Sequence, residues 1–314
     1  MIIGLCGDGF PEVRRSLRAV LPGAEMVDIG VAEGHVPRVD VLVPLGASID
    51  AELMDATRPR LIQQFGVGLQ GVDRAAARTR GIPVAYVPGA DTGNSIAVAE
   101  LAILHLLTLL RRYPAAQRSI AERRVGQPSG SMLAGKTVTV VGTGAIGTAV
   151  LTRLAAFDAV TAAVGHRSYD DYPGLTELLP PDRYRPIGEL AVALADSHIL
   201  VVCCRLTEDT RGLIGAEEFA SMPPGGWLIN VGRGPIVDYR ALLDALRSGH
   251  LAGAGLDVAW REPIDPADPL LRENVSITPH IGGVTEESYT AMATAFAANA
   301  TKALAGQPLS HVAD

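Results

Sequence analysis

The stretch TVTVVGTGAIGTAVLTRLAAF, residues 137–157, decides the fold. Its first five residues form a continuous apolar run, which is typical of a strand covered by helices on both faces. The run leads into Gly142-Thr-Gly144-Ala-Ile-Gly147, and an apolar pattern with helical spacing follows. This order predicts a Rossmann unit that binds a dinucleotide. Gly142 would allow the tight turn, Gly144 the close approach of a pyrophosphate, and Gly147 close packing of the helix on the strand.

Short apolar runs alternate with helical patterns on both sides of this unit. Strands are predicted at 2–6, 26–29, 41–45, 61–65 and 84–87 before it, and at 160–164, 199–203, 227–231, 253–258 and 275–278 after it. Strands separated by helices form parallel sheets.

We therefore expect an α/β protein with two domains. A doubly wound, NAD(P)-binding Rossmann domain is predicted over 93–285, after the turn-rich segment 88–95. A final helix, predicted at 286–305, would return to the first part of the chain. The second domain would then be discontinuous, formed from residues 1–92 and 286–314.

The composition excludes several classes of protein. The chain has 314 residues, 48% of them hydrophobic, and a net charge of −7, which excludes a disordered or strongly basic protein. The most apolar window, 96–110, contains Glu100 and His105 and is shorter than the ~20 residues of a membrane span, so it predicts a buried helix. Three cysteines are too few for a disulfide framework. We expect a cytoplasmic protein with no nucleic-acid partner, no membrane contact and no bound metal.

The end of the strand at 160–164 predicts which cofactor is preferred. About 20 residues after the glycine motif, a carboxylate normally holds the adenosine ribose of NAD. Here the strand is followed by Gly-His166-Arg167-Ser168, and no carboxylate lies between residues 160 and 168. These side chains can donate to a 2′-phosphate. The sequence predicts NADP as the preferred cofactor, with NAD also usable; a solvated loop arginine is the alternative interpretation.

Reactive side chains follow three further strands. Arg233 lies between two glycines after the strand at 227–231, Asp257 lies near the end of the next strand with Glu262 shortly after it, and His280 ends the last strand. The carboxyl ends of parallel strands form the ligand crevice of such sheets. A guanidinium can hold a carboxylate, an imidazole can move a proton, and a carboxylate can orient the imidazole and stabilise its protonated form.

Seven motifs in this order show that the sequence resembles the D-isomer-specific 2-hydroxyacid dehydrogenase family over nearly its whole length. They are QFGVGLQGVD (64–73), PGADTGNSIAVAE (88–100), LAGKTVTVVGTGAIG (133–147), LTEDTRGLIG (206–215), LINVGRGPIVD (228–238), GAGLDVAWREP (253–263) and ITPHIGG (277–283). The resemblance implies two α/β domains, of which the one formed from both chain ends is flavodoxin-like and binds the substrate. It also implies a homodimer and an NAD(P)-dependent oxidoreductase acting on a small 2-oxo acid.

The resemblance also implies a role for each matching residue. Arg233 matches the arginine that binds the carboxylate and carbonyl of the 2-oxo acid. His280 matches the acid/base that protonates the carbonyl oxygen, and Glu262 matches its carboxylate partner. Asp257 matches the aspartate beside the nicotinamide carboxamide. Val67 and Gly68 lie in the loop whose backbone N–H groups hold the substrate carboxylate.

The cofactor site is expected to include residues from several of these motifs. They are Gly142, Gly144, Ala145, Ile146, Gly147, His166, Arg167, Ser168, Arg205, Val231 and Asp257. Arg205 stands where the family usually has proline, and it either makes a second phosphate contact or is solvated.

We expect a reductase of glyoxylate or hydroxypyruvate type that uses NADPH and forms the D-2-hydroxy acid. Two alternatives remain open. One is an NAD-linked dehydrogenase of lactate or phosphoglycerate type. The other is a dinucleotide-sensing corepressor-like scaffold, which would not need an intact Arg–Glu–His set. Formate dehydrogenase activity is disfavoured, because those relatives have glutamine where Glu262 stands.

Overall fold

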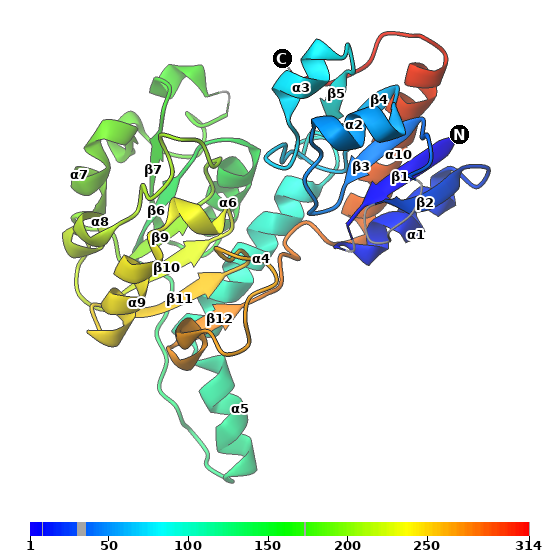
Figure 1. Cartoon of the computed structure of the whole chain (residues 1–314). Helices are drawn as coiled ribbons and strands as arrows, with labels where there is room; N and C mark the ends of the chain where they lie inside the picture. The colour runs from blue at the N-terminus through cyan, green and yellow to red at the C-terminus, as the bar shows by residue number, and fades with distance from the viewer. Residues whose placement is uncertain (8, 30–35, 173, 314) are drawn as a thin grey trace. The chain divides into compact units, whose positions relative to one another are not determined.

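The computed structural model describes residues 1–7, 9–29, 36–172 and 174–313. The chain forms two compact units, one of residues 1–94 and 284–314 and the other of residues 95–283. Each unit has one parallel sheet with helices on both faces (Figure 1). The predicted α/β fold class with two parallel sheets is confirmed. The assignment of the first unit to substrate binding stays a prediction.

The first unit has the strand order of a flavodoxin-like fold, β2-β1-β3-β4-β5. Its strands are β1 (Ile2–Cys6), β2 (Glu25–Ile29), β3 (Val41–Pro44), β4 (Leu61–Gln64) and β5 (Val84–Tyr86). Helices α1 (Pro11–Val20) and α10 (Glu286–Leu304) bury their apolar side chains on one face of the sheet, and α2 (Ala51–Thr57) and α3 (Arg74–Thr79) on the other. The last helix thus returns to the first part of the chain because Phe296 and its neighbours complete that core.

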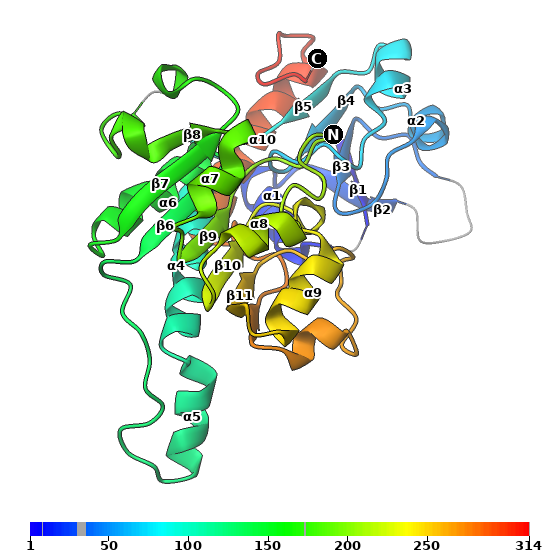
Figure 2. The ribbon, with the colours of Figure 1, turned by 90° about the vertical axis from the view of Figure 1, so that its left-hand side faces the viewer.

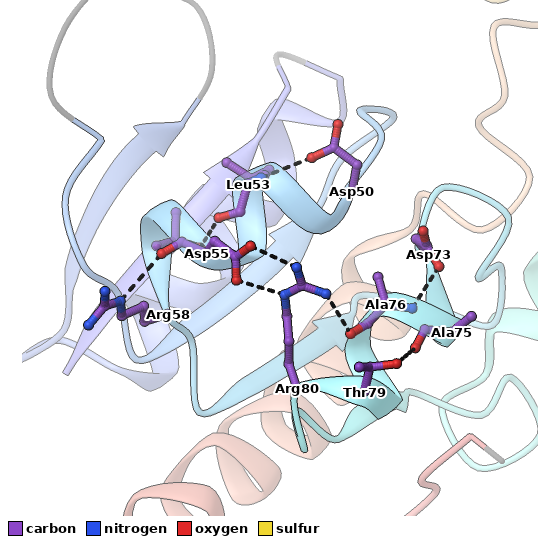
Figure 3. Close-up of polar contacts among 10 residues, drawn as sticks. Asp50, Leu53, Asp55, Arg58, Asp73, Ala75, Ala76, Thr79 and Arg80 are labelled. Atoms are coloured by element: carbon purple, nitrogen blue, oxygen red, sulfur yellow. Dashed lines mark hydrogen bonds and ion pairs between the residues drawn. The ribbon is translucent and has the colours of Figure 1, made fainter.

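Polar contacts define the ends of α2 and α3 (Figure 3). The side chains of Asp50 and Asp73 accept hydrogen bonds from the first-turn amides of these helices, each at 2.9 Å. Such N-caps satisfy backbone donors that have no partner within the helix. Arg80 follows α3 and holds Asp55 of α2 through two hydrogen bonds of 2.7 Å. These contacts fix the connections after β3 and β4.

The second unit has a seven-stranded sheet of order β12-β11-β10-β9-β6-β7-β8. Its strands are β6 (Thr137–Val141), β7 (Val160–Gly165), β8 (Tyr184–Pro186), β9 (Ile199–Val202), β10 (Gly226–Asn230), β11 (Leu251–Leu256) and β12 (Val275–Ile277). The order reverses between β6 and β9, which is the topological switch point of a Rossmann sheet. Only β8 lacks a sequence prediction among these strands, because three residues carry no alternating pattern.

The helices of the second unit cover both faces of this sheet (Figure 2). Helices α4 (Asn94–Leu110) and α6 (Ala145–Ala155) lie on one face, and α7 (Leu190–Leu194), α8 (Ala216–Ser221) and α9 (Tyr239–Arg247) lie on the other. Helix α5 (Tyr113–Ala121) follows α4 and extends away from the sheet in both views. Short 3-10 helices occur at Tyr169–Asp171, Pro181–Arg183, Ile187–Glu189, Gly234–Ile236 and Pro269–Arg272.

Within the residues that the structure describes, no single helix is long and apolar enough to cross a membrane. Helices α4 and α5 meet the length and composition criteria only as a pair, and the pair is bent by 54°.

Candidate active site

The glycine turn between β6 and α6 has the geometry that its sequence predicts. Gly142 has a φ of 101°, and a Cβ atom there would lie 2.6 Å from the backbone nitrogen of Cys204. A Cβ on Gly147 would lie 1.8 Å from the carbonyl oxygen of Gly142, so only glycine lets the helix start this close to the strand. A Cβ on Gly144 would meet no atom within 4 Å.

The start of α6 suits the diphosphate of a dinucleotide. Gly144 is the N-cap of α6, and no side chain caps the helix there. The first amides of a helix have no partner within it and favour anions. The open space at Gly144 and these amides therefore fit a pyrophosphate.

Arg233, Asp257 and His280 all follow the carboxyl ends of neighbouring strands. Strand β11 pairs in parallel with β10 on one side and β12 on the other. Residues that follow these three strands therefore lie at one edge of the sheet. This confirms the arrangement that the strand-end positions predict, while their chemical roles remain predictions.

His280 and Glu262 form a hydrogen-bonded pair. His280 Nδ1 lies 2.7 Å from Glu262 Oε2, and the other carboxylate oxygen accepts from the backbone N–H of Ala259 at 3.0 Å. Burial raises the pKa of Glu262, but the hydrogen bond and charge of His280, the Ala259 amide and the charge of Arg233 outweigh it, so the pKa is lowered. Glu262 is thus a carboxylate at neutral pH and can stabilise a protonated imidazole.

The loop of Arg233 is held by Asn230, a residue that the sequence analysis missed. Asn230 is fully buried; its amide nitrogen donates to the carbonyl oxygen of Arg233 at 3.0 Å, and its amide oxygen accepts from Gly232 at 3.0 Å. A polar amide at the end of the apolar strand WLIN was the available signal. Burial lowers the pKa of Arg233, while the charges of Glu262 and Asp257 act in the opposite direction.

The carboxylate of Asp257 is buried and accepts hydrogen bonds from other groups of the protein. Its side chain accepts hydrogen bonds from the Thr278 hydroxyl at 2.7 Å and from the amides of Ile281 and Gly282 at 2.8 Å each. Only 3% of Asp257 is exposed. The carboxylate therefore fixes the turn after β12, and its expected position beside a nicotinamide stays a prediction.

Of the residues after β7, Arg167 contacts the aromatic ring of Tyr172. His166, Arg167 and Ser168 are exposed, and the guanidinium of Arg167 lies 5.8 Å from the ring centre of Tyr172. The Tyr172 hydroxyl accepts from the Arg167 amide at 3.1 Å. Asp171 accepts from the Ser168 amide at 3.2 Å, because a 3-10 turn brings it back to the strand end. Counting along the chain from the glycine motif did not reveal this contact.

The other predicted residues lie in several environments. Val67 and Gly68 belong to the loop after β4 in the first unit, where Val67 is exposed. Ala145 is exposed and Ile146 is half-buried at the start of α6. Val231 is 4% exposed, so its side chain belongs to the core. Arg205 is exposed after β9.

Among the described residues, no group of three or more histidine, cysteine, aspartate or glutamate side chains has an arrangement that could hold a metal ion.

Comparisons with known proteins identify the family of this chain. The model of the "D-isomer specific 2-hydroxyacid dehydrogenase, NAD binding domain" family matches residues 103–282. D-3-phosphoglycerate dehydrogenase of Mycobacterium tuberculosis is 37% identical over 280 residues, which are 87% of this chain and 50% of that protein. The chain thus spans about half the length of that relative.

Two other relatives match over most of both chains. Hydroxyphenylpyruvate reductase of Plectranthus scutellarioides is 36% identical over 84% of this chain and 81% of its own. The solved structure of an NADPH-dependent glyoxylate/hydroxypyruvate reductase from Sinorhizobium meliloti, in complex with NADP and malonate, has a TM-score of 0.82 and 30% identity. It covers 99% of this chain and 96% of that one.

Proposed function

Because this chain belongs to the D-isomer specific 2-hydroxyacid dehydrogenase family, we propose that it reduces a small 2-oxo acid to the D-2-hydroxy acid with NADPH. The proposed substrates are of the glyoxylate or hydroxypyruvate type. The observation that carries the proposal is the 2.7 Å hydrogen bond between His280 and Glu262, at the sheet edge where Arg233 also lies. A panel of 2-oxo acids assayed with NADPH and NADH in parallel tests it through kcat/KM. If none of the 2-oxo acids is reduced with either cofactor, the proposal is contradicted.

Different residues of the second unit are proposed to bind the cofactor, bind the substrate and transfer the proton. When bound, the reduced nicotinamide supplies the hydride, and the turn 142–147 with the residues after β7 would hold the dinucleotide. Arg233 binds the substrate carboxylate and carbonyl oxygen, and its positive charge stabilises the developing alkoxide. His280 in its protonated form donates a proton to that oxygen, and Glu262 stabilises the protonated ring.

Backbone N–H groups of Val67 and Gly68 in the first unit are proposed to hold the substrate carboxylate as well. The loop follows the carboxyl end of β4, and Gly66 has a φ of 139°, which a side chain would strain. A glycine-rich loop exposes its amides because few side chains cover them.

The variant Glu262→Gln should move the alkaline limb of the pH–rate profile for reduction to lower pH. Reduction requires the proton on His280, so the rate falls as pH rises and the ring loses it. The lowered pKa of Glu262 keeps it anionic at neutral pH, where it favours the protonated ring, and glutamine lacks that charge. The measurement is kcat/KM for the 2-oxo acid as a function of pH. An unchanged profile would show that the carboxylate does not couple to the imidazole.

The wild-type enzyme should have a kcat/KM with NADPH more than about ten times that with NADH. One charge-assisted hydrogen bond to a 2′-phosphate contributes about 1.5–3 kcal/mol, or roughly ten- to a hundredfold in affinity. Arg167→Ala should remove most of this preference without lowering activity with NADH. Arg240→Ala, on the exposed side of α9, is the matched control and should change neither value. Equal use of both cofactors by the wild type would contradict the proposal.

An NAD-linked dehydrogenase of lactate or phosphoglycerate type is the second candidate. Asp171 favours it, because its carboxylate lies against the Ser168 amide at the end of β7 and could accept from a ribose 2′-hydroxyl. The 37% identity to a D-3-phosphoglycerate dehydrogenase also favours it. The same substrate panel distinguishes the candidates, since this one predicts that NADH is preferred.

A homodimer is the proposed assembly, formed through the segment around α5. This segment extends away from the sheet (Figures 1 and 2) and exposes large apolar side chains, among them Ile120 at 70%, Val125 at 95% and Met132 at 77%. A second copy of the chain would remove this apolar surface from water. Sedimentation velocity should show a dimer for the wild type and monomer for Ile120→Glu, with Arg240→Glu as control. A monomeric wild type would contradict the proposal.

A further inference from the structure

His105 is a buried polar side chain in the middle of the apolar helix α4, where only 1% of it is exposed. Two glycines of β11 let the helix approach the sheet. A Cβ on Gly255 would lie 2.6 Å from the Cβ of His105, and one on Gly253 would lie 3.1 Å from Leu109 Cδ2. The imidazole therefore packs directly against β11. A polar group buried there needs hydrogen-bond partners.

Both ring nitrogens of His105 have hydroxyl partners. Nδ1 lies 2.8 Å from Ser276 Oγ, and Nε2 lies 3.0 Å from Thr278 Oγ1. Ser276 and Thr278 are two positions apart, so they lie on the same face of an extended segment.

A third hydrogen bond, between Thr278 and Asp257, determines which ring nitrogen of His105 carries the proton. The Thr278 hydroxyl donates to Asp257 Oδ1 at 2.7 Å. A hydroxyl has one proton, so Thr278 accepts from His105, and the neutral ring carries its proton on Nε2. Nδ1 then accepts from Ser276. Burial lowers the pKa of His105, although the charge of Asp257 acts in the opposite direction. The ring is therefore neutral at neutral pH.

Asp257 connects the hydrogen bonds of His105 and Thr278 to the turn that contains His280. Its carboxylate accepts from the amides of Ile281 and Gly282 at 2.8 Å, and its carbonyl oxygen accepts from the amide of His280 at 2.9 Å. His280 has a φ of 56°, a left-handed conformation that residues with side chains adopt uncommonly. The hydrogen bonds to Asp257 hold this conformation, from which His280 reaches Glu262.

We propose that His105 is a positioning residue for the acid/base His280. Its Nε2–H holds the Thr278 hydroxyl on Asp257, and Asp257 holds the turn 280–282 so that His280 meets both Glu262 and the substrate oxygen. The inference rests on the proposed function, because it assigns His105 a part in the same site. His105 acts through Thr278 and Asp257 and has no contact with substrate.

The first test compares His105→Leu with His105→Gln. In His105→Leu, kcat for reduction should fall about tenfold, which is the scale of one lost hydrogen bond, while KM for the 2-oxo acid stays near the wild-type value because the Arg233 loop is unchanged. The solvent isotope effect on kcat should rise, since proton delivery by His280 becomes slower. Glutamine keeps an N–H donor for Thr278 and should restore most of kcat. Wild-type kcat and an unchanged isotope effect in His105→Leu would overturn the proposal.

The variants Thr278→Val and Thr278→Ser repeat the test without a substitution in α4. Valine has nearly the shape of threonine but lacks the hydroxyl, so it should reproduce the slower turnover and larger isotope effect, and serine should not. Thermal unfolding shows whether the His105 variants fold. Even if they do not, equal kcat for the two Thr278 variants would overturn the proposal.

Side-chain nitrogen NMR of the apoenzyme tests the network without activity. His105 should be neutral with its proton on Nε2 at neutral pH. A proton on Nδ1, or on both nitrogens, in an enzyme that reduces 2-oxo acids would overturn the role of His105 alone. An apoenzyme with the expected ring but no reduction of any 2-oxo acid would overturn the proposed function, and the positioning role with it.

Discussion

Replacing His280 with alanine should lower kcat for 2-oxo acid reduction by about 10²–10⁴-fold. The carbonyl oxygen gains negative charge as hydride arrives, and without the imidazole no positioned group can protonate it. Water must then deliver the proton, which is slower because it is neither held nor charged. The measurement is steady-state turnover at saturating NADPH and 2-oxo acid.

Cofactor binding is the control for this variant. His280 follows β12, whereas the glycine turn follows β6, so the affinity for NADPH should stay near that of the wild type. Fluorescence titration of NADPH measures it. If turnover by His280→Ala stays near normal, His280 is not the acid, and the hydrogen bond to Glu262 has a structural role.

Replacing Arg233 with lysine should raise KM for 2-oxo acids by roughly ten- to a hundredfold, although the charge is kept. A guanidinium can donate two parallel hydrogen bonds to a carboxylate and a neighbouring oxygen, and an ammonium is a point charge without that planar geometry. Loss of one charge-assisted hydrogen bond costs about 1.5–3 kcal/mol, which gives this range. The measurement is KM and kcat with glyoxylate and hydroxypyruvate.

The variant Arg233→Ala extends this test, because it removes the charge as well and should lower kcat further. Asn230 holds the backbone of the loop through the Arg233 carbonyl, so neither variant should unfold it. If KM and kcat both survive in Arg233→Lys, the substrate carboxylate is held elsewhere, and the amides of Val67 and Gly68 become the leading candidates.

The strand ends of the second unit could be predicted because parallel sheets obey simple rules. Continuous apolar runs mark buried strands, and the residues after them meet at one edge. The places of Arg233, Asp257 and His280 along the chain are therefore enough to predict that they share an edge of the sheet. The glycine turn was equally predictable, since Gly142 and Gly147 stand where a Cβ would collide with the backbone.

Asp171 shows where counting along the chain failed. It lies beyond the end of β7 in sequence, yet a 3-10 turn returns its carboxylate to the Ser168 amide. Short turns of this kind depend on a few hydrogen bonds and leave no periodic pattern. A prediction of cofactor preference therefore has to include Asp171 as well as Arg167, where the sequence alone pointed to Arg167.

The sequence by itself determined the two parallel sheets, the dinucleotide turn and the reactive residues at the strand ends, because periodicity and glycine sterics are local properties. Only the tertiary structure decided the partners of His105, which the sequence places simply in an apolar helix. Its partners Ser276 and Thr278 are 171 and 173 positions away. Their meeting depends on how closely α4 packs on β11, and that distance is set by side-chain volumes from separate parts of the chain.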